Sequence, residues 1–141
     1  MEGLRLHAFT VARVASTIAF VWFIFFLPGA WDWQRDLGAA LAVTGGIGIL
    51  IAHAQLGTSF SIKAEAHHLV TRGIYSKIRN PIYVFGMAVI AGFVFVVHRP
   101  QLWIIFVIVT LIQIVRARRE ARVLESAFGD EYRDYRRKTW F

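Results

Sequence analysis

Long apolar runs without charged residues are the main pattern of this chain, and they predict transmembrane helices. Asp, Glu, Lys and Arg are absent from residues 14–31, 37–62, 80–97 and 100–115. A helix needs about 20 mostly apolar residues to cross the hydrocarbon core, within a range of about 17–25. The first three runs reach that range, and Arg116 and Arg118 can extend the fourth by reaching toward the headgroups.

The pattern therefore predicts an all-α integral membrane protein with a single membrane-embedded domain over residues 1–141. The four spans are expected near residues 9–27, 37–55, 82–97 and 101–116. A loop over residues 56–81 separates the second span from the third, and a tail follows over residues 117–141. Pro81 suits the first turn of the third span because its missing N–H would be unpaired there anyway.

The fourth helix is expected to continue beyond the membrane, since residues 112–128 contain neither Pro nor Gly. Arg116, Glu120 and Leu124 then share one face at four-residue spacing. Gly129 is expected to end this helix, and Asp130 to cap a short basic helix. Tyr132 and Tyr135 are expected to pack that helix against the loop.

Composition and charge agree with a membrane protein and give its orientation. The chain is 57% hydrophobic and only 18% charged, whereas soluble domains are about 45–50% apolar and about 25% charged. All but two of the 16 basic residues, Arg35 and Arg99, lie near the N-terminus, in the long loop or in the tail. The positive-inside rule places these segments, and so both termini, in the cytoplasm.

The same composition limits the partners that we expect. The net charge of +7 is interpreted as topology and as contact of the protein with the anionic lipid bilayer. Nucleic-acid binding is the weaker interpretation of this charge, and no nucleic-acid partner is predicted. The shortness of the chain favours a bacterial inner membrane over the endoplasmic reticulum.

Two polar segments stand out between the apolar runs. Residues 67–83 read H-H-L-V-T-R-G-I-Y-S-K-I-R-N-P-I-Y, and residues 116–135 contain R-x-x-x-E-A-x-x-L-x-x-x-F-G-D-E-Y-x-x-Y. From the residues alone, the first is a basic interfacial loop and the second an amphipathic tail. Neither segment requires a catalytic function on that basis.

At these two segments the chain resembles the isoprenylcysteine carboxyl methyltransferases and the related phospholipid methyltransferases. Members carry a pattern close to H-x-L-V-T-x-G-x-Y-x-x-x-R-H-P-x-Y before a transmembrane hairpin and R-x-x-x-E-E-x-x-L-x-x-x-F-G-x-E-Y-x-x-Y after it. Order and spacing agree over roughly residues 56–138. The resemblance implies a membrane enzyme that transfers a methyl group from S-adenosyl-L-methionine to a lipophilic small molecule or prenylated substrate.

The resemblance also implies roles for individual residues. Arg116 falls on the arginine that faces the methyl-accepting carboxylate and is the implied catalytic residue, and no metal site is implied. The residues that fall on the family's cofactor-binding positions are His67, Leu69, Val70, Tyr75, Asn80, Pro81, Tyr83 and Glu120. These residues are expected to enclose a nucleoside-sized hollow between residues 67–83 and Glu120.

The chain departs from the family pattern at two positions. Asn80 stands where the family usually has His, and Ala121 where it usually has a second Glu. Asn cannot titrate, so any proton-transfer role of that His is lost. A carboxylate acceptor is already ionised at pH 7 because its ordinary pKa is about 4, whereas an amine acceptor must first lose a proton. A carboxylate is therefore the favoured acceptor.

Three other functions stay open at this point. They are a lipid-amine or small-molecule methyltransferase on the same scaffold, an NADPH-dependent sterol-type reductase, and a non-catalytic membrane protein of the same fold. His53, near the cytoplasmic end of the second span, is a secondary candidate for ligand contact. Gly45, Gly46 and Gly48 suit close helix packing, either within the chain or in an oligomer.

Overall fold

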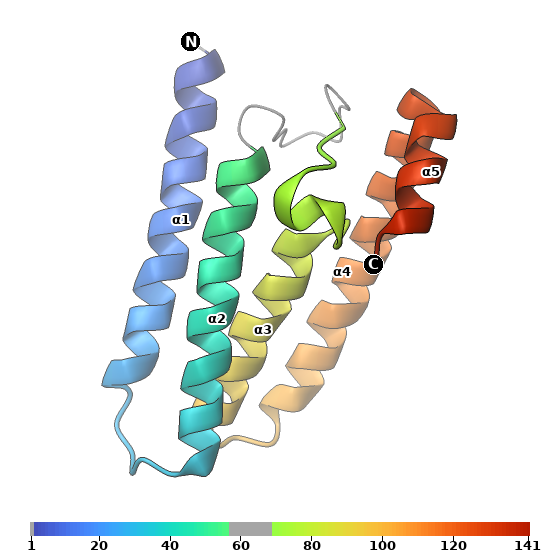
Figure 1. The fold of residues 1–141 in the computed structure, drawn as a ribbon. Helices are drawn as coiled ribbons and strands as arrows, with labels where there is room; N and C mark the ends of the chain where they lie inside the picture. Colours follow the sequence, from blue (N-terminus) through green and yellow to red (C-terminus); the bar gives the residue numbers. More distant parts are fainter. Residues whose placement is uncertain (1, 57–68) are drawn as a thin grey trace.

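The computed structural model describes residues 2–56 and 69–141, which form helices joined by short connections (Figure 1). α1, α2, α3 and α4 run up and down in turn, and α5 turns back beside the end of α4. The elements are α1 (Glu2–Phe26), α2 (Trp33–Leu56), the 3₁₀ turn η2 (Gly73–Ser76), α3 (Pro81–Val97), α4 (Leu102–Phe128) and α5 (Asp130–Lys138). The predicted all-α fold is confirmed, and His67 lies outside the described residues.

Length and composition single out α2 within the described residues. It is the one helix there that is long and apolar enough to cross a membrane. Val14–Phe26 and Pro81–Val97 are shorter apolar helical segments. In α4 the apolar run ends at Arg116, but the helix itself continues to Phe128 as predicted.

Three helices begin before their expected positions, the first of them α1, which begins at Glu2 rather than near residue 9. α2 begins at Trp33 rather than Leu37, because the Asp32 carboxylate accepts a hydrogen bond from the Arg35 backbone N–H at 2.9 Å and caps the helix. α5 begins at Asp130 itself, with Gly129 in the capping position at φ +53°. The Asp130 carboxylate instead accepts hydrogen bonds from the Arg133 side chain.

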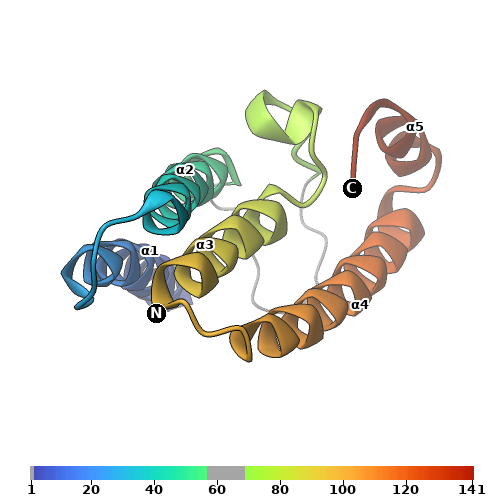
Figure 2. The ribbon, with the colours of Figure 1, turned by 90° about the horizontal axis from the view of Figure 1, so that it is seen from below.

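Glycines bring the backbones of α2 and α3 into direct contact, and α3 lies between α2 and α4 (Figure 2). A Cβ atom on Gly38 would lie 2.6 Å from the Gly92 carbonyl oxygen, and one on Gly45 would lie 2.7 Å from the Phe85 carbonyl oxygen. Gly48 likewise faces the Phe85 ring. Such close approach is typical of small residues between membrane helices, and here it occurs within one chain.

Arg35 ties the end of α1 to the start of α2. Its side chain is buried and donates hydrogen bonds to the carbonyl oxygens of Leu27 and Gly29, the second at 2.8 Å. Its guanidinium also lies 4.5 Å from the centre of the Trp31 ring. The last carbonyls of a helix have no partner within the helix, and Arg35 supplies one beside the end of α1.

Large apolar side chains stay exposed along α1 and α4. Trp22 is 64% exposed, Ile104 66% and Leu111 58%. An apolar surface of this extent is unusual on a soluble monomer. These helices therefore present faces that suit a lipid or protein environment better than water.

Candidate functional site

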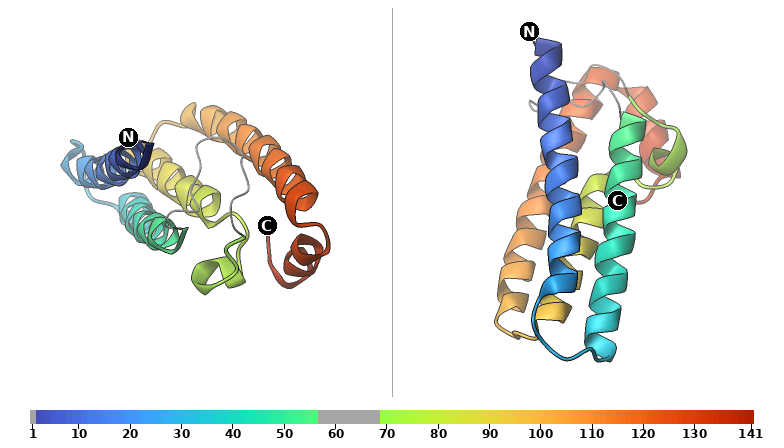
Figure 3. Two further views of the ribbon diagram at one scale, coloured as in Figure 1. Left: turned by 90° about the horizontal axis from the view of Figure 1, so that it is seen from above. Right: turned by 90° about the vertical axis from the view of Figure 1, so that its left-hand side faces the viewer.

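The segment before α3 folds against the helices that follow it, as the sequence predicts. η2 and α5 lie side by side (Figure 3). Leu69, Tyr132 and Tyr135 form a buried cluster against which Leu124 and Phe128 pack. These contacts confirm the predicted packing of the tail tyrosines against the loop.

Tyr75 is joined to this cluster by a hydrogen bond. It is buried, and its backbone carbonyl accepts a hydrogen bond from the Tyr135 hydroxyl at 2.6 Å. The same turn is tied to α2, since the Ile74 N–H donates to the Gln55 side-chain oxygen at 2.7 Å. Gly73 precedes it at φ +60°, a conformation that glycine adopts without steric cost.

The end of the chain pairs with the residues that lead into α3. The Trp140 N–H donates to the Lys77 carbonyl at 2.7 Å, and the Trp140 carbonyl accepts from the Arg79 N–H at 3.0 Å. The Phe141 carbonyl accepts from the Asn80 N–H at 2.9 Å. This backbone ladder, here called the C-terminal strap, fixes the position of Asn80 at the start of α3.

Asn80 occupies the capping position of α3, but its side chain makes no capping hydrogen bond. Its backbone carbonyl accepts from the N–H groups of Tyr83 and Val84, both at 3.1 Å. Pro81 is the first residue of the helix and is fully buried. The Asn80 side chain is therefore not needed for capping.

The two polar segments meet at Tyr83 and Glu120. The Tyr83 hydroxyl donates a hydrogen bond to the Glu120 carboxylate, and both residues are half-buried. The Arg116 guanidinium, one turn earlier on α4, lies 5.7 Å from the centre of the Tyr83 ring, within the range of a cation–π contact. Within the described part of the chain, Glu120 accepts from Tyr83 and forms no ion pair with Arg116.

Burial moves the ionisation of the nearby phenols, which are neutral at physiological pH even at their ordinary pKa of about 10, to still higher pH. Burial raises the pKa of Tyr75, and the charges of Tyr135 and Glu120 raise it further. Burial also raises the pKa of Tyr135 to about 12, and it raises that of Tyr132. These side chains therefore act as hydrogen-bond donors and apolar surface rather than as bases.

The structure brings most of the predicted site residues to one end of the bundle, where they fall into separate groups with different neighbours. Tyr83, Glu120 and Arg116 form a contiguous group, whereas Leu69 packs with the tail tyrosines and Val70 follows it half-buried. The His53 ring nitrogen Nδ1 lies 3.0 Å from the Ile49 carbonyl of its own helix. The predicted hollow between residues 67–83 and Glu120 stays a prediction, because residues 57–68 are not described.

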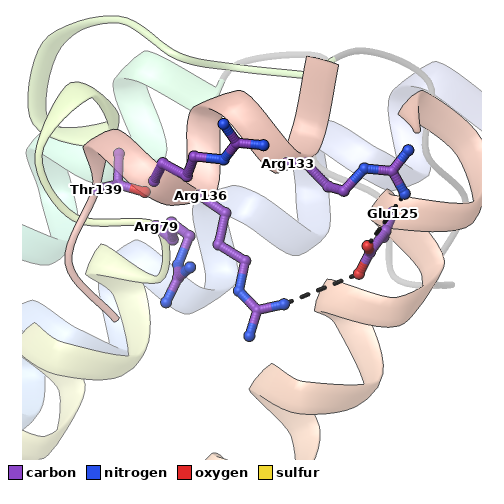
Figure 4. Close-up of a pocket in the computed structure, with 6 residues that line it drawn as sticks. Arg79, Glu125, Arg133, Arg136 and Thr139 are labelled. Carbon is purple, nitrogen blue, oxygen red and sulfur yellow. Dashed lines mark ion pairs between the residues drawn. The ribbon is translucent and has the colours of Figure 1, made fainter. Parts of the chain in front are cut away.

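An open pocket of about 370 Å³ lies close by, between the start of α3, α4 and α5 (Figure 4). Neither Tyr83 nor Glu120 belongs to its lining. It is lined by Arg79, Glu125, Arg133, Arg136, Arg137 and Thr139. Sequence reasoning missed this pocket and the C-terminal strap, although the basic run at residues 136–138 followed by Trp140 was a signal for a surface near lipid headgroups.

Known proteins resemble the chain over the region that holds these features. The phospholipid methyltransferase family matches residues 33–131, from α2 to the start of α5. A protein-S-isoprenylcysteine O-methyltransferase from Tribolium castaneum is 30% identical over 83 residues. That match covers 54% of this chain and 30% of the length of the relative. Because the family match covers well over half of the sequence and includes the residues around Tyr83 and Glu120, the chain belongs to the phospholipid methyltransferase family.

Proposed function

We propose that this protein is a membrane methyltransferase that depends on S-adenosyl-L-methionine and acts on a lipophilic acceptor, with a carboxylate favoured. One observation carries the proposal. The Tyr83 hydroxyl bonds to Glu120, with Arg116 beside the same ring. These three residues come from the two segments that resemble methyltransferases, so the contact joins the implied cofactor ligands to the implied substrate clamp.

We propose that α1 to α4 span the membrane, with both termini on the cytoplasmic side of a bacterial inner membrane. The exposed apolar faces of α1 and α4 support this arrangement, because they suit contact with lipid. The distribution of basic residues supports the orientation, since Arg35 and Arg99 alone lie at the opposite end.

The polar and aromatic side chains at Tyr83 fit the proposed cofactor. When bound, S-adenosyl-L-methionine supplies a methyl group on a positively charged sulfur. The half-buried carboxylate of Glu120 is able to accept hydrogen bonds from ribose hydroxyls or an ammonium group. The half-buried ring of Tyr83 offers an aromatic face for the adenine or for the positive charge.

The residues present favour a carboxylate as the methyl acceptor. Arg116 carries a planar, forked guanidinium that matches a carboxylate with two parallel hydrogen bonds. No base is needed, because the carboxylate is ionised at pH 7, and the chain's task reduces to positioning and exclusion of water. Asn80 has no titratable group, and the raised pKa of Tyr75 makes that phenol a poor base. An amine acceptor, which must first lose a proton to a base, is therefore less well supported than a carboxylate.

Titration calorimetry with S-adenosylhomocysteine in detergent tests cofactor binding. We expect Glu120→Ala to raise the dissociation constant about 10–100-fold, because hydrogen bonds to charged groups contribute about 1.5–3 kcal/mol. Glu125→Ala is the matched control, since it removes the same charge from the same helix at a residue that lines the other pocket. Binding of NADPH in place of S-adenosylhomocysteine would favour a reductase, and binding of neither would favour a non-catalytic protein.

Methylation of a farnesylated cysteine analogue with a free carboxylate tests the acceptor. We expect Arg116→Ala to lower turnover strongly while the affinity for S-adenosylhomocysteine changes little. Arg118→Ala, which removes an exposed charge two residues away, should change neither. Equal loss of turnover and cofactor affinity in Arg116→Ala would remove the assignment of this residue as substrate clamp.

A further inference from the structure

The pocket between Arg79 and α5 has an unusual lining, with four guanidinium groups around one carboxylate. Figure 4 shows Arg79 and Arg136 extending into the same space. Glu125 accepts ion pairs from Arg133 at 3.6 Å and from Arg136 at 3.9 Å. The positive groups of the lining therefore outnumber the negative one.

Ion pairs outside the pocket account for part of this charge. Arg133 also pairs with Asp130 at 2.5 Å, and Arg137 pairs with Asp134 at 3.8 Å. Arg79 forms no ion pair with any residue that the structure describes. Arg79 and the loosely paired Arg136 are consequently the two groups best able to receive an anion.

The position of the pocket indicates which anion. α5 runs back from the tip of α4 toward the level at which α3 begins (Figure 1), and the C-terminal strap joins Trp140 to Ile78 beside Pro81. Trp140 is 64% exposed. An exposed Trp beside basic residues at the end of a membrane span is typical of the lipid–water interface.

This pocket is distinct from the group formed by Tyr83, Glu120 and Arg116. Glu125 follows Glu120 by five positions, and successive helix residues turn by about 100°, so the two carboxylates point about 140° apart around α4. Tyr83 lies beside Glu120, whereas α5 and its arginines lie beside Glu125.

We propose that this pocket binds the phosphate group of an anionic phospholipid in the cytoplasmic leaflet. The forked guanidinium groups of Arg79 and Arg136 match phosphate oxygens, and the bound lipid holds α5 and the strap against the membrane surface. The inference rests on the membrane arrangement proposed above, but it requires no methyl transfer.

Binding of phosphatidylglycerol to the full chain in a neutral detergent, measured by native mass spectrometry and thermophoresis, tests the proposal. We expect Arg79→Gln/Arg136→Gln to raise the dissociation constant at least tenfold, which corresponds to about 1.4 kcal/mol. Arg118→Gln/Arg122→Gln removes the same charge outside the pocket and should change it less than threefold. Equal effects of the two pairs, or equal binding of phosphatidylcholine, would overturn the proposal. If the first pair fails to fold, the single variant Arg136→Gln is measured against Arg118→Gln with the same criteria.

Two further arms identify the source of the phosphate. Inorganic phosphate should compete only at millimolar concentration, and if it binds as tightly as the lipid, the pocket takes a soluble phosphate and the lipid proposal is wrong. Displacement of the lipid by S-adenosylhomocysteine would assign the pocket to the cofactor and would also overturn it. Lipid binding without any affinity for S-adenosylhomocysteine would support this inference while the proposed function failed.

Discussion

An alanine at Gly45 tests the close packing of α2 on α3 that places Tyr83 opposite Glu120. The added methyl group would lie 2.7 Å from the Phe85 carbonyl oxygen, 2.9 Å from a Val89 methyl and 3.0 Å from the Val89 nitrogen. Ordinary contacts between heavy atoms lie near 3.5–4.0 Å, so the helices must separate by roughly 0.5–1 Å. Two of the three neighbours are backbone atoms, which no rotamer change can move away.

Gly86→Ala is the matched control for this change, because nothing lies within 4 Å of a Cβ atom at Gly86. Both substitutions gain about the same helix propensity, up to ~1 kcal/mol, so their difference isolates the steric term. Overpacking of this kind costs about 1–3 kcal/mol. We expect Gly45→Ala to be less stable than Gly86→Ala by about 2 kcal/mol.

The free energy of unfolding of both variants, measured by titration with sodium dodecyl sulfate and followed by circular dichroism, checks this estimate. Gly45→Ala should also weaken the binding of S-adenosylhomocysteine, since a displaced α3 carries Tyr83 away from Glu120. The reasoning would be refuted if Gly45→Ala and Gly86→Ala had equal stability. In that case the helices would not be as close as the structure shows.

Two further predictions concern the ends of the bundle. Tyr135→Phe should lower the stability by about 1–3 kcal/mol in the same titration, because it leaves the buried Tyr75 carbonyl without its donor; no change would show that water replaces the hydroxyl. At the other end, hydrogen bonds from backbone N–H groups lower the pKa of Asp32, with His98 adding to the effect, while the hydrogen bond to Val96 and then the contact with Asp32 raise the pKa of His98. The ionised Asp32 carboxylate therefore stabilises the fold above pH ~3.8, and this contribution to the free energy of unfolding is lost as the pH falls through its lowered pKa. The protonated His98 ring stabilises the fold below pH ~6.5, and its contribution is lost as the pH rises through its raised pKa. The unfolding temperature of Asp32→Asn should therefore fall furthest below that of the wild type between pH ~4 and 6.5, and a constant difference up to pH 9 would contradict this pairing.

The helices of this protein could be predicted from sequence wherever local chemistry decides their limits. Pro81 begins α3 because proline has no backbone N–H and a fixed φ, and Gly129 ends α4 because glycine adopts a positive φ without steric cost. Both properties are independent of the rest of the fold. The start of α2 was missed, since the helix capped by Asp32 begins at Trp33, four positions before the charge-free run that served as the guide. Gly45 was correctly interpreted as a packing residue, but its partner on α3 depends on how the two helices face each other.

The candidate site was predictable where side-chain identity carries the information. Glu120 was identified from the register of its motif, and the structure gives it Tyr83 as a partner. The C-terminal strap could not be predicted, because its hydrogen bonds join backbone groups and need no particular side chains at Lys77 or Trp140. The pocket at Arg79 depends on this strap and was missed for the same reason.

The C-terminal strap also orders events during biosynthesis. The segment from Lys77 to Asn80 leaves the ribosome well before Trp140 is made, so its backbone groups have no strap partners while α3 is being synthesised. The entrance to α3 consequently reaches its final shape only after α5, Trp140 and Phe141 have been made. The contact between Tyr83, in the first turn of α3, and Glu120 is then set in its final surroundings only when α5 is in place.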